Sequence, residues 1–477
     1  MGVDNCKMKR CGPVSLLTLC RFTLGTPWMT LAPATLISLF LLSGAIPIGA
    51  TAAQRLLPST MGDGVHDDTA GIQAALDSGV AVVHLPTPPK RYLISRTLVI
   101  HSGQTLQAER DATIRLANNA LVHMLTNAEH AKGDRGISVI GGIWDGNNAH
   151  QSCEYHTTHR WQVPYDPERY LGVLIQFDNV TDLRIAHLTL KDPETFGIQA
   201  GNLRRFTIED ITFDYNLLRL NMDGVHLHGN CHQGRIVNLK GTTNDDLVAL
   251  NADDGTMFEM SRGSITDVQI DGIWSENGYT AVRLLSAGSP IRRVRISNIY
   301  GSFRYYVTSF GNYTLHPGER SEISEVVIDG VYCAKPTEPL TRPLDSDEWG
   351  RHNCPLFWVE SRTHVVNLHL ANILRRESLE NAPPTIFVSS ESAVEHLGIR
   401  DVSVTNQAGT PLDFLVNNGT ISALQLANVY LKAEGGKPRG HALVNGKTIN
   451  GVQLGNCVAV NMLPEGQEGW AQTEKAQ

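Results

Sequence analysis

The sequence predicts an all-β fold, a parallel β-solenoid in which short strands stack rung upon rung. A six-residue pattern recurs, with apolar residues at its first, third and sixth positions and usually Asn, Asp or Gly just before the last of them. A second short apolar segment falls between successive copies, and no helical periodicity separates the two. Two or three strands per repeat without an intervening helix are typical of one solenoid coil, whereas a propeller blade needs four strands.

The copies of the pattern follow one another at unequal intervals. Their central apolar residues lie between 23 residues (Ile185 to Ile208) and 42 residues (Ile328 to Leu370) apart. The copies are LRIAHL (183–188), FTIEDI (206–211), VQIDGI (268–273), VRISNI (294–299), VVIDGV (326–331), LHLANI (368–373), LGIRDV (397–402), LQLANV (424–429), VQLGNC (452–457) and, more weakly, GRIVNL (234–239). Unequal intervals predict loops of unequal size between rungs, and such loops commonly wall a binding cleft.

The chain divides into three predicted parts. Residues 1–53 combine basic residues, an apolar run and the small-residue stretch GATAA, which predicts a secretory signal peptide. An uncleaved membrane anchor is the alternative for this segment. Residues 54–460 form the predicted β-helix domain, and residues 461–477 a C-terminal tail. The protein is therefore expected to be secreted or extracytoplasmic, or else anchored in a membrane through its N-terminal segment only.

The segment HDDTAGIQAAL (66–76) predicts a short N-terminal capping helix. Aspartate supplies its N-cap, and Ile72, Ala75 and Leu76 share one face. We therefore interpret the acidic cluster of Asp63, Asp67 and Asp68 as structural.

Charge and cysteine content narrow the function classes. The formal net charge is −8 with a pI near 6.1, and no basic block is present, so a nucleic-acid partner is disfavoured. Neither C-x-x-C nor H-E-x-x-H spacing occurs, so we expect no metal and no cofactor. Export would permit a disulfide, for which Cys333 with Cys354 is the candidate pair. We expect a monomer.

Side-chain columns can be predicted because equivalent residues of neighbouring rungs lie about 4.8 Å apart. The alignment places Ile198, Val225, Val248, Val282 and Val307 inward. The outward columns are then Phe196, Asp223, Asp246, Thr280 and Tyr305; Gln199, His226, Ala249, Arg283 and Thr308; and Gly201, His228, Asn251 and Leu285. One face thus gathers Asp223, Asp245 and Asp246 with two imidazoles, a guanidinium and an amide.

Carboxylates gathered on one face suit the hydrolysis of a glycosidic bond. One protonated acid donates to the leaving oxygen while a carboxylate on the other side activates water. Crowded aspartates raise one another's pKa, which helps one of them to stay protonated. Aspartates also cap turns between rungs, but three of them converging with His226 and Arg283 favour a functional site.

The ordered motifs resemble those of glycoside hydrolase family 28, the polygalacturonase and rhamnogalacturonase group. The motifs are GGIWDGN (141–147), LRIAHLTLKDPETFGI (183–198), NMDGVHLHG (221–229), NDDLVAL (244–250) and AVRLL (281–285). The segment GDGVHDDTAGIQAALDSG (62–79) is similar to the N-terminal capping element that this family shares with pectate-lyase-like β-helix proteins. The resemblance covers about residues 60–310 and implies a right-handed parallel β-helix and inverting, single-displacement hydrolysis.

The resemblance also implies a role for each matched residue. The family's Asn-Thr-Asp motif matches Asn221-Met222-Asp223, so Asp223 would help to activate water. Its Asp-Asp motif matches Asp245 as the general acid and Asp246 as a partner of Asp223 in the base role. Its Arg-Ile-Lys motif retains Arg283 but has Leu285 in place of lysine.

The predicted substrate-binding residues are Asn221, His226, His228, Asn251 and Arg283. The family's Gly-His-Gly motif is not found. His226 or His228 is the candidate to occupy part of the space that this motif fills in the family. The missing lysine removes a cation that would pair with a carboxylated sugar, so both a pectin-like and a non-uronate glycan stay open as substrates.

Two other functions compete with hydrolysis. A polysaccharide lyase on the same scaffold would use Arg283 and a cation near Asp253-Asp254, and a non-catalytic β-helix would use the aspartates only to bind glycan hydroxyls. The expected partner is in each case a polysaccharide or oligosaccharide. Trp144 is either a sugar-stacking platform or core packing, and the aromatic-rich insertion 153–170 is a candidate substrate wall.

Overall fold

A computed structural model describes residues 59–151, 172–219, 221–253, 262–312, 315, 317–338, 354–437 and 439–463. The predicted leader (1–53), the insertion 153–170 and Asp254 lie outside the described residues, as does the tail beyond residue 463. In the described part of the chain, no helix is long and apolar enough to cross a membrane.

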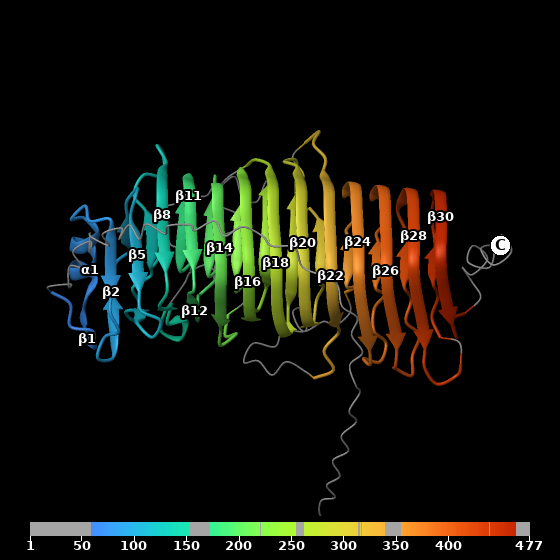
Figure 1. Cartoon of the computed structure of the whole chain (residues 1–477), viewed down its shortest axis with the longest axis horizontal. Coiled ribbons are helices and arrows are strands. Elements are labelled where there is room, and N and C mark those ends of the chain that lie inside the picture. The colour runs from blue at the N-terminus through green and yellow to red at the C-terminus, as the bar shows by residue number, and fades with distance from the viewer. Residues whose placement is uncertain are drawn as a thin grey trace, which may run out of the picture. The chain divides into compact units, whose positions relative to one another are not determined.

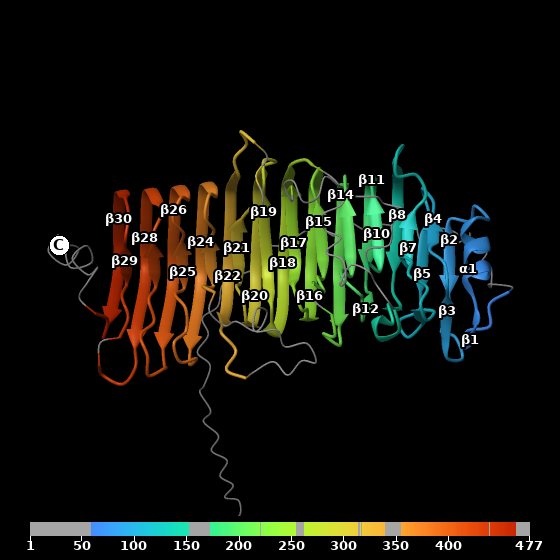
Figure 2. The same ribbon diagram turned by 180° about the vertical axis from the view of Figure 1, so that it is seen from behind.

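The described residues form a parallel β-helix built from two sheets, which confirms the predicted solenoid (Figure 1). One sheet contains 12 short parallel strands, several of which are labelled in Figure 2. They are β4 (Leu98–Ile100), β7 (Leu125–Asn127), β10 (Ile175–Asp178), β13 (Ile198–Gly201), β15 (Val225–His228), β17 (Asp246–Asp253), β19 (Thr280–Ser286), β21 (Thr308–Gly311), β23 (Phe357–Val359), β25 (Ile386–Val388), β27 (Leu415–Asn417) and β29 (Leu443–Asn445).

The other sheet contains 18 strands, which lengthen toward the C-terminal rungs. The N-terminal rungs use pairs of short strands: β1 (Asp63–Asp67), β2 (Val82–Leu85), β3 (Arg91–Ile94), β5 (Thr105–Ala108), β6 (Thr113–Leu116), β8 (Asp134–Ile140), β9 (Ile143–Asp145), β11 (Val180–Ala186) and β12 (Thr189–Lys191). The later rungs use one long strand each: β14 (Arg204–Asp214), β16 (Cys231–Thr242), β18 (Ile265–Gly278), β20 (Ile291–Phe303), β22 (Ile323–Ala334), β24 (His364–Glu377), β26 (Ala393–Asn406), β28 (Thr420–Ala433) and β30 (Ile449–Val460). The change occurs at β14, which pairs with both β11 and β12.

A left-handed residue at a fixed place explains the Asn, Asp or Gly of the repeated pattern. The penultimate residue of every copy has a positive φ, which turns the chain within the long strand and favours Gly and Asn. These residues are His187, Asp210, Asn238, Gly272, Asn298, Gly330, Asn372, Asp401, Asn428 and Asn456. Their side chains also link rungs, since Asn428 donates to Asp401 at 2.8 Å and Asn456 to Asn428 at 2.9 Å.

The N-terminal helix is confirmed as α1 (Thr69–Leu76), followed later by one 3₁₀ turn, η1 (Asn148–His150). Ile72 and Leu76 are fully buried against the first rungs. Asp68 occupies the N-cap position, but its carboxylate accepts instead from the backbone of Met61, at 2.6 Å, and from Gly62 and Leu93. The acidic cluster therefore ties the cap to the first rung, as its structural interpretation predicts.

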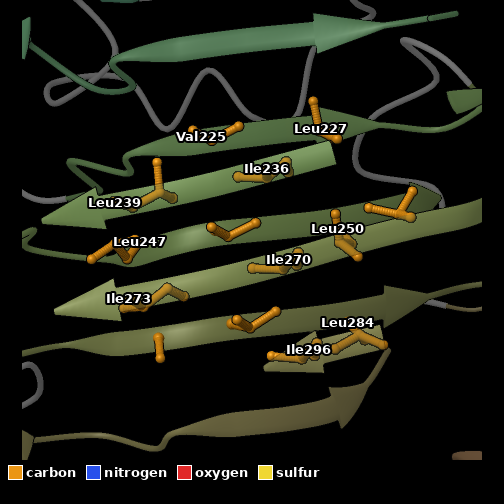
Figure 3. Packing of buried hydrophobic residues seen from close by; sticks show 14 of the residues in the cluster. Val225, Leu227, Ile236, Leu239, Leu247, Leu250, Ile270, Ile273, Leu284 and Ile296 are labelled. Carbon is orange, nitrogen blue, oxygen red and sulfur yellow. The ribbon is translucent and has the colours of Figure 1, made fainter. Parts of the chain in front are cut away.

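The core lies between the two sheets. Figure 3 shows Val225, Leu227 and Leu250 of the short-strand sheet among Ile236 and Ile270 of the long strands. These side chains are fully buried and belong to one continuous apolar cluster. Trp144 is buried in the same cluster, and its indole donates to the Gly141 carbonyl at 3.1 Å. Its role is therefore core packing.

Two sequence predictions are wrong in detail. Val282 pairs with Thr308 rather than with Val307, and Leu284 pairs with Phe310. Val307 and Phe310 are nevertheless both fully buried in the apolar cluster, so the side chains here do not alternate strictly. Cys333 and Cys354 are both buried and form no disulfide. The sulfur of Cys333 lies 3.5 Å from the Ile299 carbonyl oxygen.

Candidate active site

Three neighbouring short strands bring the predicted residues onto one face. Asp223 stands just before β15, Asp246 opens β17, and Arg283 lies within β19. The register pairs His226 with Ala249 and Ala249 with Arg283, so these predicted columns are confirmed.

Main-chain bonds hold the aspartates beside one another. The Gly224 amide donates to the Asp246 carbonyl at 2.9 Å, and the Gly197 amide to the Asp223 carbonyl at 3.0 Å. Gly224 has to be glycine because a Cβ there would lie 2.5 Å from the Leu247 carbonyl oxygen. The rungs therefore approach closely where the aspartates project.

The protonation of Asp245 and Asp246 is set by burial and by each other. Burial, together with the charges of Asp246 and Asp223, raises the pKa of Asp245 well above its ordinary value. Burial also raises the pKa of Asp246, but Arg283 and His226 oppose that rise. Adjacent carboxyl groups thus have unequal surroundings: Asp245 favours the protonated form, and Asp246 is the one held near cations.

Arg283 contacts Asp246 directly. Its Nη1 lies 3.4 Å from Asp246 Oδ2, and its side chain is 13% exposed while that of Asp246 is 3% exposed. A guanidinium so placed stabilises the ionised form of the carboxylate.

His226 is fixed on three sides. Its Nδ1 lies 2.6 Å from Asp223 Oδ2, and its Nε2 lies 3.3 Å from Asn251 Nδ2. Its ring stacks on Phe196 with centroids 4.3 Å apart. A proton on Nδ1 is donated to the carboxylate, which leaves Nε2 to accept from the amide. His226 thereby orients the Asp223 carboxylate.

His226→Ala should lower kcat/KM by about 10–100-fold, because a hydrogen bond to a charged group contributes about 1.5–3 kcal/mol. Steady-state kinetics on the polysaccharide that the protein cleaves measure this loss. His232→Ala, a change on β16 outside the site, is the control and should retain activity. An unchanged kcat/KM for His226→Ala would contradict the orienting role.

Two other predicted binding residues, His228 and Asn221, differ in how far they are exposed to solvent. His228 is 3% exposed, its ring centroid lies 4.6 Å from that of His226, and its Nε2 lies 3.0 Å from Gln199 Nε2. Burial, and next the charge of His226, lower its pKa well below the ordinary value, so it is neutral. His228 supports His226 from within. Asn221 is partly exposed with φ of 53°, so it is the more accessible of the two.

A tyrosine wall and a fourth carboxylate were missed by sequence reasoning. Tyr279 and Tyr305 stack with centroids 4.7 Å apart, and Tyr305 and Tyr306 are 4.5 Å apart. Burial, and next the charge of Asp245, raise the pKa of Tyr279, which places it beside the acid. Glu360 follows β23, and its carboxyl group interacts with Arg283 and Asp246. Tyr305 stood in a predicted column without a role, whereas nothing in the sequence marked Glu360.

The part of the chain that the structure describes contains no cluster of metal ligands. No group of three or more His, Cys, Asp or Glu side chains there is arranged to hold an ion.

Comparisons with known proteins support the fold. No family model matches the sequence, and no curated protein matches it in sequence. The structure is similar to a family 28 exopolygalacturonase of Yersinia enterocolitica, with a TM-score of 0.55 and 15% identity over 83% of this chain and 76% of that one. It is also similar to the A-module of the mannuronan C-5 epimerase AlgE4 of Azotobacter vinelandii, with a TM-score of 0.53 and 12% identity over 83% and 98%. The fold is thus a right-handed parallel β-helix, as the sequence predicted.

Proposed function

We propose that the protein is a secreted glycoside hydrolase that cleaves a polysaccharide by single displacement with inversion. The observation that carries the proposal is the pair of buried, adjacent aspartates with unequal surroundings: Arg283 contacts Asp246, while burial and the neighbouring carboxylates raise the pKa of Asp245 well above its ordinary value. The motif resemblance to glycoside hydrolase family 28 supports the same assignment.

In the proposed reaction, the Asp245 carboxyl donates its proton to the leaving glycosidic oxygen. The Asp223 and Asp246 carboxylates accept a proton from a water molecule on the other side of the sugar. The water oxygen bonds to the anomeric carbon as the bond to the leaving oxygen breaks, so the configuration inverts. His226 keeps the Asp223 carboxylate oriented through the 2.6 Å hydrogen bond.

A panel of neutral and acidic polysaccharides tests the proposal. We expect new reducing ends without the ultraviolet absorbance of an unsaturated product. Absorbance growing with the reducing ends would instead identify a lyase, which eliminates rather than hydrolyses. Binding without release from any member of the panel would identify a glycan-binding protein.

The pH profile of kcat/KM should be bell-shaped and displaced upward from the ordinary carboxylate range. The alkaline limb reports loss of the Asp245 proton, whose pKa is raised well above 3.8, and the acidic limb reports protonation of the base carboxylates, of which Asp246 also has a raised pKa. Initial rates across pH on the active member of the panel measure both limbs. A rate that falls only below about pH 4, the ordinary aspartate range, would contradict the assignment.

A further inference from the structure

Glu360 follows β23, two rungs on from Arg283 in β19. Its backbone amide donates to the Phe310 carbonyl at 2.9 Å, which anchors it beside β21. Its carboxyl group lies near Ser309, the residue that pairs with Arg283 in the register. The carboxylate also lies over Gly311, where an added Cβ would be 2.5 Å from Oε2. A rung with serine and glycine at these positions makes room for the carboxylate.

Arg283 is therefore shared between two carboxylates. Asp246 lies 3.4 Å away on one side, and Glu360, two rungs on from β19, interacts electrostatically with the same guanidinium. Glu360 is only half-buried, so it can meet a ligand. Leu285, beside Gly311 in the register, adds apolar surface there and no charge.

Two other cations near the tyrosine wall, among the described residues, are engaged elsewhere. The Lys335 ammonium is buried and donates to the main-chain carbonyls of Arg304 and Tyr305. The Arg304 guanidinium donates to the Asn277 carbonyl and lies 5.5 Å from the centroid of the Tyr279 ring. Above the pKa values of Asp246 and Glu360, both of which burial raises, a carboxylate on a bound sugar would face Arg283 already matched by two negative side chains. Juxtaposed like charges weaken binding strongly.

We infer that the sugar unit bound beside Arg283 is uncharged and that Glu360 is the specificity residue that selects it. Burial raises the pKa of Glu360 and Arg283 opposes that rise, so the selection operates above this pKa. The ionised carboxylate then accepts a hydrogen bond from a sugar hydroxyl and repels the carboxylate of a uronate. This inference rests on the proposed hydrolase function and specifies its substrate as a neutral glycan.

Binding to the full-length Asp245→Asn variant tests the inference without turnover. Calorimetry would compare oligogalacturonate with neutral oligosaccharides of galactose, arabinose, xylose, rhamnose, glucose and mannose. At least one neutral oligosaccharide should bind tenfold or more tightly than oligogalacturonate. Adding Glu360→Gln should strengthen oligogalacturonate binding about tenfold and weaken that of the neutral ligand. Glu209→Gln on β14, which removes the ion-pair partner of Arg184, is the matched control and should change the binding of neither ligand.

The outcomes separate this inference from the proposed function. Tighter binding of oligogalacturonate than of every neutral ligand, or an unchanged preference in Glu360→Gln, overturns the inference. If polygalacturonate is then hydrolysed with inversion, the proposed function stands without it. Absence of binding to every probe overturns both.

Discussion

Asp245→Asn should lower kcat on the cleaved glycan by about 10²–10⁴-fold, the range that a positioned general acid contributes. The amide keeps the shape of the side chain but has no acidic proton for the leaving oxygen. Initial rates of reducing-end release measure the loss. Asp192→Asn is the matched control, because burial raises the pKa of Asp192 as well, and it should retain activity.

The leaving group separates the acid from the base. With an aryl glycoside of the cleaved sugar, whose leaving group needs no proton, Asp245→Asn should recover most of its rate. Asp246→Asn should stay slow on both substrates, because the base is needed for either. Equal losses for Asp245→Asn on both substrates would contradict the acid role.

The stability of Asp245→Asn should show that its loss of activity is not caused by misfolding. Folding raises the pKa of Asp245, so its favourable contribution is complete below the unfolded pKa of about 3.9 and is lost as pH rises through the native pKa. Asparagine carries no charge to desolvate. Thermal unfolding should therefore show Asp245→Asn at least as stable as the wild type at pH 7.5, with its advantage gone near about pH 3.5.

Glu377→Ala should reduce the free energy of unfolding by about 3–5 kcal/mol, the cost of leaving one partner of a buried ion pair alone. Arg375 and Glu377 are both fully buried, with Nη2 and Oε2 2.7 Å apart. Arg375 also donates to Thr385 Oγ1 at 2.9 Å and to the Pro383 carbonyl at 3.0 Å. Without Glu377, the guanidinium keeps its charge in an apolar surrounding.

Urea denaturation measures this loss, with an exposed pair as the control. Asp267→Asn breaks the exposed pair with Arg293 while keeping a residue that tolerates the left-handed backbone there, and should change stability by no more than about 1 kcal/mol. Replacing Arg375 by Met and Glu377 by Leu together should recover much of the loss, because no buried charge is then left unpaired. Equal effects of Glu377→Ala and Asp267→Asn would contradict this account.

The buried pair also supports the wall of the candidate site. Glu377 accepts from the Lys335 backbone amide at 3.3 Å, and the Lys335 ammonium holds the Tyr305 carbonyl. Burial, and next Arg375, lower the pKa of Lys335 to about 7. The tyrosine wall is thus connected to the core of the following rungs.

The rung architecture and the aspartate cluster could be predicted because a solenoid has simple geometry. Neighbouring rungs are one strand spacing apart, so aligning Val225 with Val248 makes Asp223 and Asp246 neighbours. The fixed left-handed corner, seen at Asn298 and Asn428, kept each copy recognisable.

The details that failed depend on local departures from strict alternation and on long loops. Val307 and Phe310 are three residues apart and both fully buried, so a period of two could not give the register of β21. Glu360 follows a stretch of nearly 50 residues after Gly311, across which no column can be carried from sequence alone. The disulfide prediction rested on Cys333 and Cys354 flanking a Pro- and charge-rich loop, which does not say where either sulfur points.

The stereochemistry of the first product tests the central claim most directly. Proton NMR during early turnover of the cleaved glycan reports the configuration of the new reducing end before mutarotation. Inverting hydrolysis by Asp223, Asp245 and Asp246 predicts the configuration opposite to that of the cleaved bond. A retained configuration, or an unsaturated product in place of a new reducing sugar, would contradict it.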